Sequence, residues 1–413
     1  MIKRIFTTTL FSAVSRAFST GTNLFVLFFI ARFLGPQPLG VYGIAFTFLY
    51  LFFSVSSMNL DIFLGKEIAY IQRDKDRTFA LFNEFAAATI YGVWASAAVL
   101  LLSALLYHRL SLYLLVLTFV TGILLGVEKN LSGFLLGRER MDVEAFYSLL
   151  TFVVVVVLLM VNKGGMTIEG IFIVRIVGLV VGIGGRLLNL RQFTAFKRFR
   201  LKLRFFHELK YYWFNQIAGF LIRQVDVLIL SFFVEEAMLG AYFLALRIYI
   251  TVNIAAEVFA LSLTPFISRT FQGQETIEFN RFLKRITGMA LLGGLLLAAA
   301  LFFSGSLLIS LFSRDLVAES SRYLKLLALV IPCRVGVSIL GAFLSSSRYQ
   351  KVRFYLSLGL SLSFMSITLV LAGMYLADGA VAARILSEIL AFGLYFYVVF
   401  YKIQPLTQPQ KKL

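Results

Sequence analysis

The sequence predicts an all-α polytopic membrane protein with about twelve transmembrane helices, arranged as two six-helix lobes that are parallel repeats. The prediction rests on the composition, the spacing of apolar runs and an internal duplication. Of the 413 residues, 60% are hydrophobic and 15% are charged, and the mean hydropathy is +0.87. Water-soluble proteins are about 45–50% apolar and about 25% charged. Lipid is therefore the expected solvent for most of this chain.

Twelve apolar runs are long enough to cross a bilayer, whose core of about 30 Å needs about 20 helical residues. The first run follows Lys3 and Arg4, as in a signal peptide. Arg16 interrupts it and no A-x-A site follows before Gly35, so it is interpreted as a span. The predicted spans are Phe11–Phe33, Leu39–Leu60, Phe79–Tyr107, Leu110–Val127, Val143–Val161, Ile168–Leu188, Tyr211–Val234, Leu239–Ile267, Ile286–Phe312, Tyr323–Phe343, Phe354–Leu376 and Ala380–Tyr401.

The basic residues behind the net charge of +18 predict the orientation of these spans. Most lie in alternate connections on the amino-terminal side, including the linker Arg186–Lys210, interpreted as an anchor on anionic membrane lipids. The other connections carry only Arg32, Arg109, Lys163, Arg314 and Arg322. By the positive-inside rule, both termini of this multi-pass protein are expected to be cytoplasmic. Because the basic residues do not gather on one hydrated face, no nucleic-acid partner is expected.

An internal duplication divides the chain into an N-terminal lobe, residues 1–200, and a C-terminal lobe, residues 201–413. A shift of 200 aligns Leu39-Gly40-Val41-Tyr42 with Leu239-Gly240-Ala241-Tyr242, and a shift of 209 aligns Ser148-Leu149 with Ser357-Leu358. Because each lobe has an even number of spans, the repeats are parallel, and the substrate site is expected between lobes that rock around it. Gly133-x-x-x-Gly137, Gly178-x-x-x-Gly182 and the cluster Gly288, Gly293 and Gly294 predict close helix packing.

Residues for metal or hydrolytic chemistry are sparse. A lone cysteine, Cys333, excludes an intramolecular disulfide and a multi-thiolate metal site. The two histidines, His108 and His207, are too far apart in the chain to support a zinc or Ser-His-Asp site. The predicted external connections are too short to fold as a domain. No enzyme activity, metal or cofactor is therefore expected.

Four motifs occur in order between residue 24 and about residue 270. They are Ala31-Arg32-Phe33-Leu34-Gly35-Pro36 with Leu39-Gly40-Val41-Tyr42, then Leu60–Ala69, then Gln224–Leu230 with Leu239–Tyr242, and last Leu263-Thr264-Pro265 with Ser268-Arg269. In this order they resemble the oligosaccharide (O-antigen and capsule, Wzx-type) flippases, the polysaccharide-transport branch of the multidrug/oligosaccharidyl-lipid/polysaccharide (MOP) exporter superfamily. Lys66 stands where that family more usually has Arg.

The resemblance implies a MOP/MATE-like fold with two six-helix lobes around a central cavity. It also implies transport, without an enzymatic step, of a polyprenyl-diphosphate-linked oligosaccharide across the cytoplasmic membrane for lipopolysaccharide, O-antigen or capsule biosynthesis. A polysaccharide polymerase and its chain-length machinery would then be partners.

Ionisable residues inside the predicted spans are the candidate site residues, because each costs at least about 2.5–3.5 kcal/mol on insertion and so faces the bundle interior or a cavity. The basic surplus suits a diphosphate, which accepts bidentate hydrogen bonds from arginine. Glu144, Glu169 and Arg186 are left aside as too near the span ends. The substrate-binding candidates are Arg223, Arg247, Arg334 and Arg175, then Arg16 and Lys325 nearer the span ends, and Asn23, which the shift of 200 places opposite Arg223.

The acids have two interpretations. Arg223 and Asp226 (i,i+3), and Arg384 and Glu388 (i,i+4), are spaced to form ion pairs on one helix face. Glu84 and Glu257 are candidates for binding a coupling proton or sodium ion, or for salt bridges to the arginines.

Alternative functions stay open. A cation-coupled multidrug (MATE-like) antiporter should have cavity carboxylates without nearby arginines. A peptidoglycan-precursor flippase typically has fourteen spans. A membrane glycosyltransferase or ligase needs an acid/base pair or metal-binding acids, and only Asp74-x-Asp76, flanked by three cations, offers such a motif.

Overall fold

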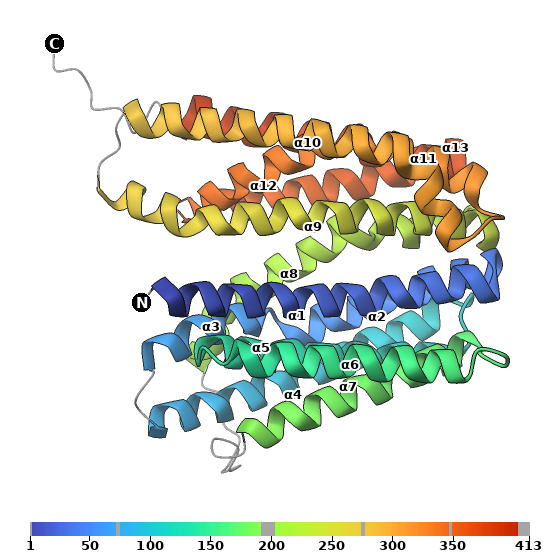
Figure 1. The fold of residues 1–413 in the computed structure, drawn as a ribbon, viewed down its shortest axis with the longest axis horizontal. Helices are drawn as coiled ribbons and strands as arrows, with labels where there is room; N and C mark the ends of the chain where they lie inside the picture. Colours follow the sequence, from blue (N-terminus) through green and yellow to red (C-terminus); the bar gives the residue numbers. More distant parts are fainter. Residues whose placement is uncertain (1, 72–74, 191–202, 274–276, 347–348, 404–413) are drawn as a thin grey trace. The chain divides into compact units, whose positions relative to one another are not determined.

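Helices make up nearly all of the computed structural model, which describes residues 2–71, 75–190, 203–273, 277–346 and 349–403 (Figure 1). These residues contain no strand, because a chain in lipid has to satisfy its backbone hydrogen bonds internally. The predicted all-α fold class is confirmed. The chain divides into two compact units, Met1–Phe220 and Leu221–Leu413, and each is described by itself.

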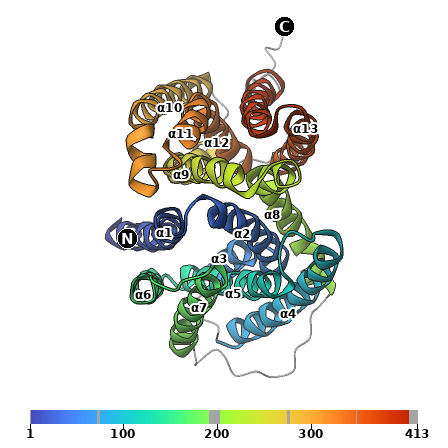
Figure 2. The ribbon, with the colours of Figure 1, turned by 90° about the vertical axis from the view of Figure 1, so that its right-hand side faces the viewer.

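The N-terminal unit is a bundle in which α5 packs against α2, α3 and α7, while α6 packs against α1 and α7 (Figure 2). Its turn at Gly35 has φ 95°, a left-handed conformation that glycine adopts without strain, and Pro36 then starts the next helix. The elements are α1 (Ile2–Phe29), the π-helical turn η1 (Ile30–Leu34), α2 (Pro36–Ser57), α3 (Leu60–Ile71), α4 (Lys75–Leu106), α5 (Leu112–Gly137), α6 (Met141–Val161), α7 (Ile168–Leu190) and most of α8 (Leu203–Leu230).

In the C-terminal unit, which α8 enters at Leu221, α12 packs against α9, α10 and α13, while α11 packs against α9 and α10. Helix α13 is broken at Leu376, whose φ of 55° and ψ of −131° are not helical. The elements are α9 (Glu236–Gly273), α10 (Ile277–Phe312), α11 (Val317–Ala328), α12 (Ile331–Ser346), α13 (Gln350–Tyr397) and the π-helical turn η3 (Val398–Ile403).

Glycines bring helices close together at several predicted positions. A Cβ atom at Gly133 would lie 2.4 Å from the Cα of Asp61, and one at Gly137 would lie 2.7 Å from the Cβ of Ile68, so α5 admits α3 only because these positions are glycines. The predicted packing role is confirmed for this pair. In α10 the predicted close packing is found at Gly294, which faces Pro332. It is not found at Gly288 or Gly293, where no described atom lies within 4 Å of an added Cβ atom.

Nine helices in the described residues are long and apolar enough to cross a membrane, and the pair α11 and α12, bent by 47°, adds a tenth. This pair covers the predicted span Tyr323–Phe343. The segment Lys351–Lys402 has 52 residues. At a rise of about 1.5 Å per residue, its length exceeds twice the thickness of a bilayer core, so it is long enough for two spans. Its break at Leu376 lies at the boundary between the last two predicted spans. Helix α8, predicted as the seventh span, is not among the apolar helices, and it contains the polar residues Asn215, Gln216 and Gln224 as well as Arg223 and Asp226.

The outward surfaces of several helices are apolar. Trp94 and Leu105 of α4 are 72% and 73% exposed, and Phe303 of α10 is 83% exposed. Such large apolar side chains on a helix surface indicate contact with lipid. The structure therefore supports a multi-pass membrane protein.

Candidate functional site

A buried cluster of three polar residues joins α1, α2 and α7 in the N-terminal unit. Arg175 donates from Nη1 to the hydroxyl of Tyr42 at 2.7 Å and from Nη2 to Oδ1 of Asn23 at 2.9 Å. Its guanidinium also lies 5.8 Å from the ring centroid of Phe46. Arg175 is only 5% exposed and its bond to Tyr42 is buried, whereas Asn23 is half-buried.

A second cluster of similar composition joins α8, α9 and α13 in the C-terminal unit. Arg384 donates from Nη2 to Oδ2 of Asp226 at 2.5 Å and from Nη1 to the carbonyl oxygen of Ile222, also at 2.5 Å. The hydroxyl of Tyr242 donates to the same Asp226 oxygen at 2.5 Å. Asp226 and Arg384 are 0% and 3% exposed, so this is a buried ion pair.

The two clusters are related by the internal duplication but differ by one charge. Tyr42 and Tyr242 are 200 residues apart, and Arg175 and Arg384 are 209 apart, the two shifts found in the sequence. The third member is the neutral Asn23 of α1 in one unit and the acid Asp226 of α8 in the other, which lie 203 residues apart and are related by neither shift. Among the described residues Arg175 makes no ion pair, so its positive charge is held by neutral groups, whereas that of Arg384 is balanced.

The described ion pairs of Asp226 and Glu388 run between helices, and not along one helix as the spacing predicted. Asp226 pairs with Arg384 of α13, and it is buried whereas the Arg223 side chain on its own helix is exposed. Glu388 pairs with Arg334 of α12, with Nη1 3.8 Å from Oε1, and accepts a hydrogen bond of 3.5 Å from Tyr249 of α9. Both of these buried carboxylates are thus balanced by an arginine of another helix.

The other predicted residues lie at separate places. Arg247 of α9 donates to Oε1 of Gln224 and lies 4.6 Å from the ring centroid of Phe243. Lys325 of α11 lies 5.9 Å from the ring centroid of Phe302. Of the remaining predicted residues, Arg16 of α1 is exposed and Glu84 of α4 is half-buried. Glu257 belongs to α9, and its side chain lies outside the described part of the chain.

The predicted arginines are divided between the units, with Arg175 in the N-terminal one and Arg223, Arg247 and Arg334 in the C-terminal one. A common cavity lined by them stays a prediction.

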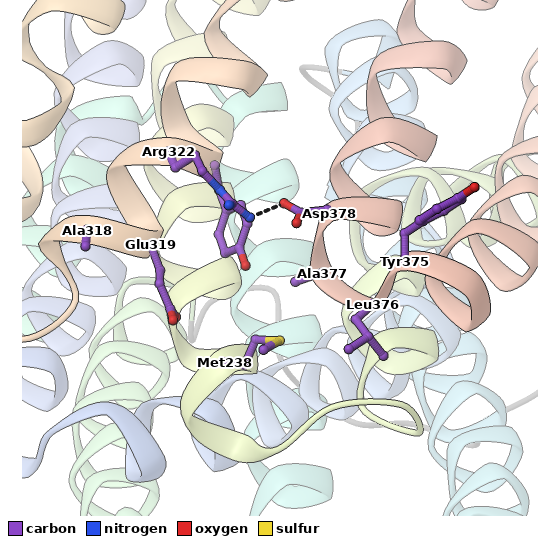
Figure 3. Close-up of a pocket in the computed structure, with 9 residues that line it drawn as sticks. Met238, Ala318, Glu319, Arg322, Tyr375, Leu376, Ala377 and Asp378 are labelled. Carbon is purple, nitrogen blue, oxygen red and sulfur yellow. Dashed lines mark hydrogen bonds and ion pairs between the residues drawn. The ribbon is translucent and has the colours of Figure 1, made fainter.

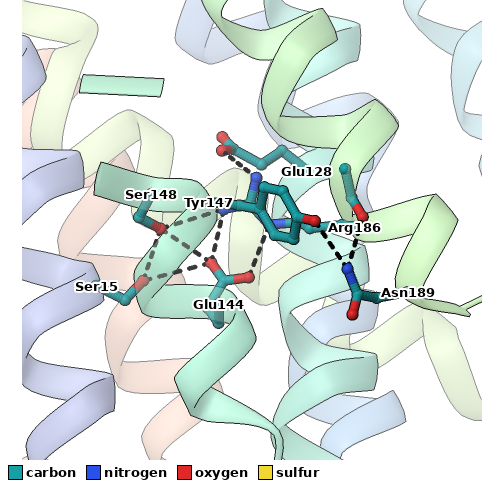
Figure 4. Close-up of polar contacts among 8 residues, drawn as sticks. Ser15, Glu128, Glu144, Tyr147, Ser148, Arg186 and Asn189 are labelled. Carbon is teal, nitrogen blue, oxygen red and sulfur yellow. Dashed lines mark hydrogen bonds and ion pairs between the residues drawn. The ribbon is translucent and has the colours of Figure 1, made fainter. Parts of the chain in front are cut away.

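The sequence interpretation missed a buried ionic network at the end of α7 (Figure 4). Arg186 is fully buried and forms ion pairs with Glu144 of α6 at 2.7 Å and Glu128 of α5 at 3.0 Å. Glu144 and Arg186 lie near the ends of their predicted spans and are left aside for that reason. Glu128 falls just outside the predicted fourth span, which ends at Val127, whereas α5 continues to Gly137. The packing motif Gly133-x-x-x-Gly137 was the signal that the helix continues.

A pocket of about 410 Å³ lies in the C-terminal unit between α11 and the break in α13 (Figure 3). Arg322 and Asp378 form an ion pair across it, and both side chains are more than half exposed. None of the predicted site residues lines it. The lining residues are Met238, Ala318, Glu319, Arg322, Tyr323, Tyr375, Leu376, Ala377 and Asp378.

Solved structures resemble the whole chain. The lipid II flippase MurJ in an inward closed conformation has a TM-score of 0.72 and 15% identity, covering 94% of this chain and 87% of that one. An inward-facing multidrug resistance MATE family transporter has a TM-score of 0.74 and 12% identity, covering 97% and 100%. This chain has the MOP superfamily fold.

The MOP fold also occurs in a transporter from Pyrococcus furiosus, with a TM-score of 0.66 and 14% identity over 95% of this chain and 94% of that one. No family model or curated protein matches the sequence. MOP proteins of this fold include both a lipid flippase and multidrug transporters, so the fold does not distinguish between these substrates.

Proposed function

We propose that this MOP-fold chain is a flippase that moves a polyprenyl-diphosphate-linked oligosaccharide across the cytoplasmic membrane, by alternating access, for surface polysaccharide biosynthesis. The observation that carries the proposal is Arg175, a buried guanidinium whose contacts are a hydroxyl, an amide oxygen and an aromatic ring. A buried charge held by neutral groups favours an anionic ligand, and guanidinium geometry matches diphosphate oxygens.

The choice of substrate class rests on the polarity of these buried groups, because the fold supports lipid flippases and multidrug transporters equally. In the MOP superfamily transporter from Pyrococcus furiosus, the reverse polarity of the binding pocket suggests a different function. A cationic drug would be repelled by Arg175. O-antigen or capsule synthesis, a polymerase partner and cytoplasmic termini belong to the same proposal.

The test compares Arg175→Ala and Arg175→Lys with wild type in proteoliposomes that contain a fluorescent polyprenyl diphosphate bearing N-acetylglucosamine. Arg175→Ala should lower the flipping rate by about 100-fold, as expected for about 2–3 kcal/mol of charge-assisted hydrogen bonding. Arg175→Lys keeps the positive charge but loses the planar guanidinium that can donate two parallel hydrogen bonds. Its flipping rate should lie between those of wild type and Arg175→Ala. Arg314→Ala, which removes an exposed arginine, is the matched control and should leave the rate unchanged.

An unchanged rate in Arg175→Ala would remove Arg175 from the site. Efflux of ethidium driven by a proton or sodium gradient, with no flipping of the lipid, would replace the proposal with a multidrug antiporter. Incorporation of labelled sugar by the purified protein would instead indicate a glycosyltransferase or ligase.

A further inference from the structure

The ionic network of the N-terminal unit contains more negative than positive charge. Arg186 donates from Nε to Oε2 of Glu144 at 2.7 Å and from Nη2 to Oε1 at 3.0 Å. Its Nη1 lies 3.0 Å from Oε1 of Glu128. One guanidinium therefore faces two carboxylates, and the Arg186, Glu144 and Glu128 side chains are 0%, 5% and 15% exposed. A buried site of this kind is one negative charge in excess.

The two carboxylates are not equivalent. Glu144 takes both guanidinium bonds of a bidentate pair and also accepts hydrogen bonds of 3.3 Å from Ser15 of α1 and Ser148 of α6. Glu128 has a single contact with Arg186 (Figure 4). The arginine and both serines thus balance Glu144, and the excess charge belongs to Glu128.

A buried hydroxyl without a partner lies beside Glu128. Thr151 of α6 is 7% exposed, and its Oγ1 has no hydrogen-bond partner among the described residues. A Cβ atom at Gly182 of α7 would lie 2.3 Å from this oxygen, 2.8 Å from Nη1 of Arg186 and 3.7 Å from Oε1 of Glu128. Three polar atoms therefore converge where Gly182 has no side chain.

Among the charged groups on the neighbouring helices, Arg175 of α7 also attracts Glu128 electrostatically, and others make contacts of their own. Asp61 of α3 lies 3.7 Å from Lys129, and Arg138 at the end of α5 donates to Thr78 of α4 at 2.9 Å. Further charged residues on the packed helices are Arg16 of α1, Lys75, Asp76, Arg77 and Glu84 of α4, Glu139 and Arg140 after α5, Asp142 of α6 and Glu169 of α7; from α2, Ser56 faces α5 at Gly126.

The other repeat lacks this charge. The shift of 209 places Ser357 and Tyr395 at the positions of Ser148 and Arg186, and their hydroxyl oxygens lie 3.1 Å apart in a neutral hydrogen bond. The same shift places Val337 at the position of Glu128 and Arg353 at that of Glu144, so neither carboxylate is repeated. Packing of the repeated fold therefore does not require the ionic network.

We infer that Glu128 is a proton-binding site, formed with Arg186, Glu144 and Thr151. The proton adds to a carboxylate oxygen of Glu128 and no other covalent bond changes. Protonation neutralises the excess charge and removes the ion pair between α5 and α7, while the bidentate pair keeps α7 on α6. The site thus couples proton uptake to the packing of α7, a function beyond substrate binding.

Infrared difference spectra of the purified full chain in lipid, between alkaline and acidic buffer and without substrate, test the site. Wild type should show the C=O stretch of a buried protonated carboxyl group. Glu128→Gln, which keeps the side-chain shape, should lose that band, whereas Asp142→Asn, a change at an exposed acid, should retain it. Thr151→Val should shift the band because it removes the neighbouring hydroxyl.

A band that persists in Glu128→Gln, or is absent from wild type, would overturn the assignment. A band that Thr151→Val leaves unshifted would remove Thr151 from the site. Replacing choline with sodium in the buffer at constant pH distinguishes a proton site from a sodium site. Loss of the band on addition of sodium would assign the site to sodium. Because no lipid-linked sugar is present, these outcomes are independent of the flippase proposal.

Discussion

Neutralising Asp226 should destabilise the protein far more than neutralising an exposed acid. Asp226→Asn preserves the size of the side chain but leaves the guanidinium of Arg384 without its carboxylate in a site that is 0–3% exposed. Removing one partner of a buried ion pair costs about 3–5 kcal/mol, because the other charge stays buried and uncompensated. The Tyr242 hydroxyl also loses a charged acceptor.

The matched control is Asp378→Asn, which breaks the pair with Arg322 at side chains that are 55% and 58% exposed. Exposed pairs contribute about 0–1 kcal/mol, since water screens both charges. For a unit of about 200 residues, 1 kcal/mol corresponds to about 2–4 °C in the midpoint of thermal unfolding. We expect a fall of roughly 6–20 °C for Asp226→Asn and less than about 4 °C for Asp378→Asn.

Thermal unfolding of the detergent-solubilised full chain, followed by circular dichroism at one heating rate, measures both midpoints. The double variant Asp226→Asn with Arg384→Gln should recover part of the loss, because neither residue of this pair then carries an unpaired buried charge. Equal unfolding midpoints for Asp226→Asn and Asp378→Asn would refute the buried pair. So would a double variant whose loss of stability equals the sum of the losses caused by Asp226→Asn and Arg384→Gln measured separately.

Two further predictions concern packing and orientation. Gly133→Ala should lower stability by about 1–3 kcal/mol, because its Cβ would overlap the backbone of Asp61, whereas Gly288→Ala should be neutral or stabilising by up to about 1 kcal/mol; equal unfolding midpoints would contradict the close contact. The predicted orientation places Lys163 outside and Arg140 inside. In a Cys333→Ser background, a membrane-impermeant maleimide should therefore label Lys163→Cys in intact spheroplasts and Arg140→Cys only after permeabilisation. The reverse pattern would overturn the predicted orientation.

Most of the fold followed from hydrophobic length and the duplication, because each apolar run has to be long enough to cross the bilayer. The errors have a physical cause in tertiary contacts. The fourth span was ended at Val127, where hydropathy falls, but α5 continues because α3 packs along its glycine face at Gly133 and Gly137. Hydropathy measures contact with lipid and does not detect a polar helix end covered by another helix.

The candidate site was predictable by residue type and not by pairing. Sequence identified Arg175 and Asn23 as buried polar positions, and the structure joins them through a hydrogen bond. It could not pair Asp226 with Arg384, which are 158 residues apart, because spacing along one helix reveals only neighbours on that helix. Nor could it find Glu128, Glu144 and Arg186, whose burial depends on three helices meeting.

The sequence by itself determined that this is a helical membrane protein built from a repeat and rich in intramembrane arginine, because composition and periodicity are properties of the chain alone. Only the tertiary structure decided which charges are balanced. Arg384 and Arg186 are held by acids from other helices, whereas Arg175 is held by neutral groups. The net charge of a buried site depends on which side chains meet in space, so it distinguishes arginines that are alike in sequence.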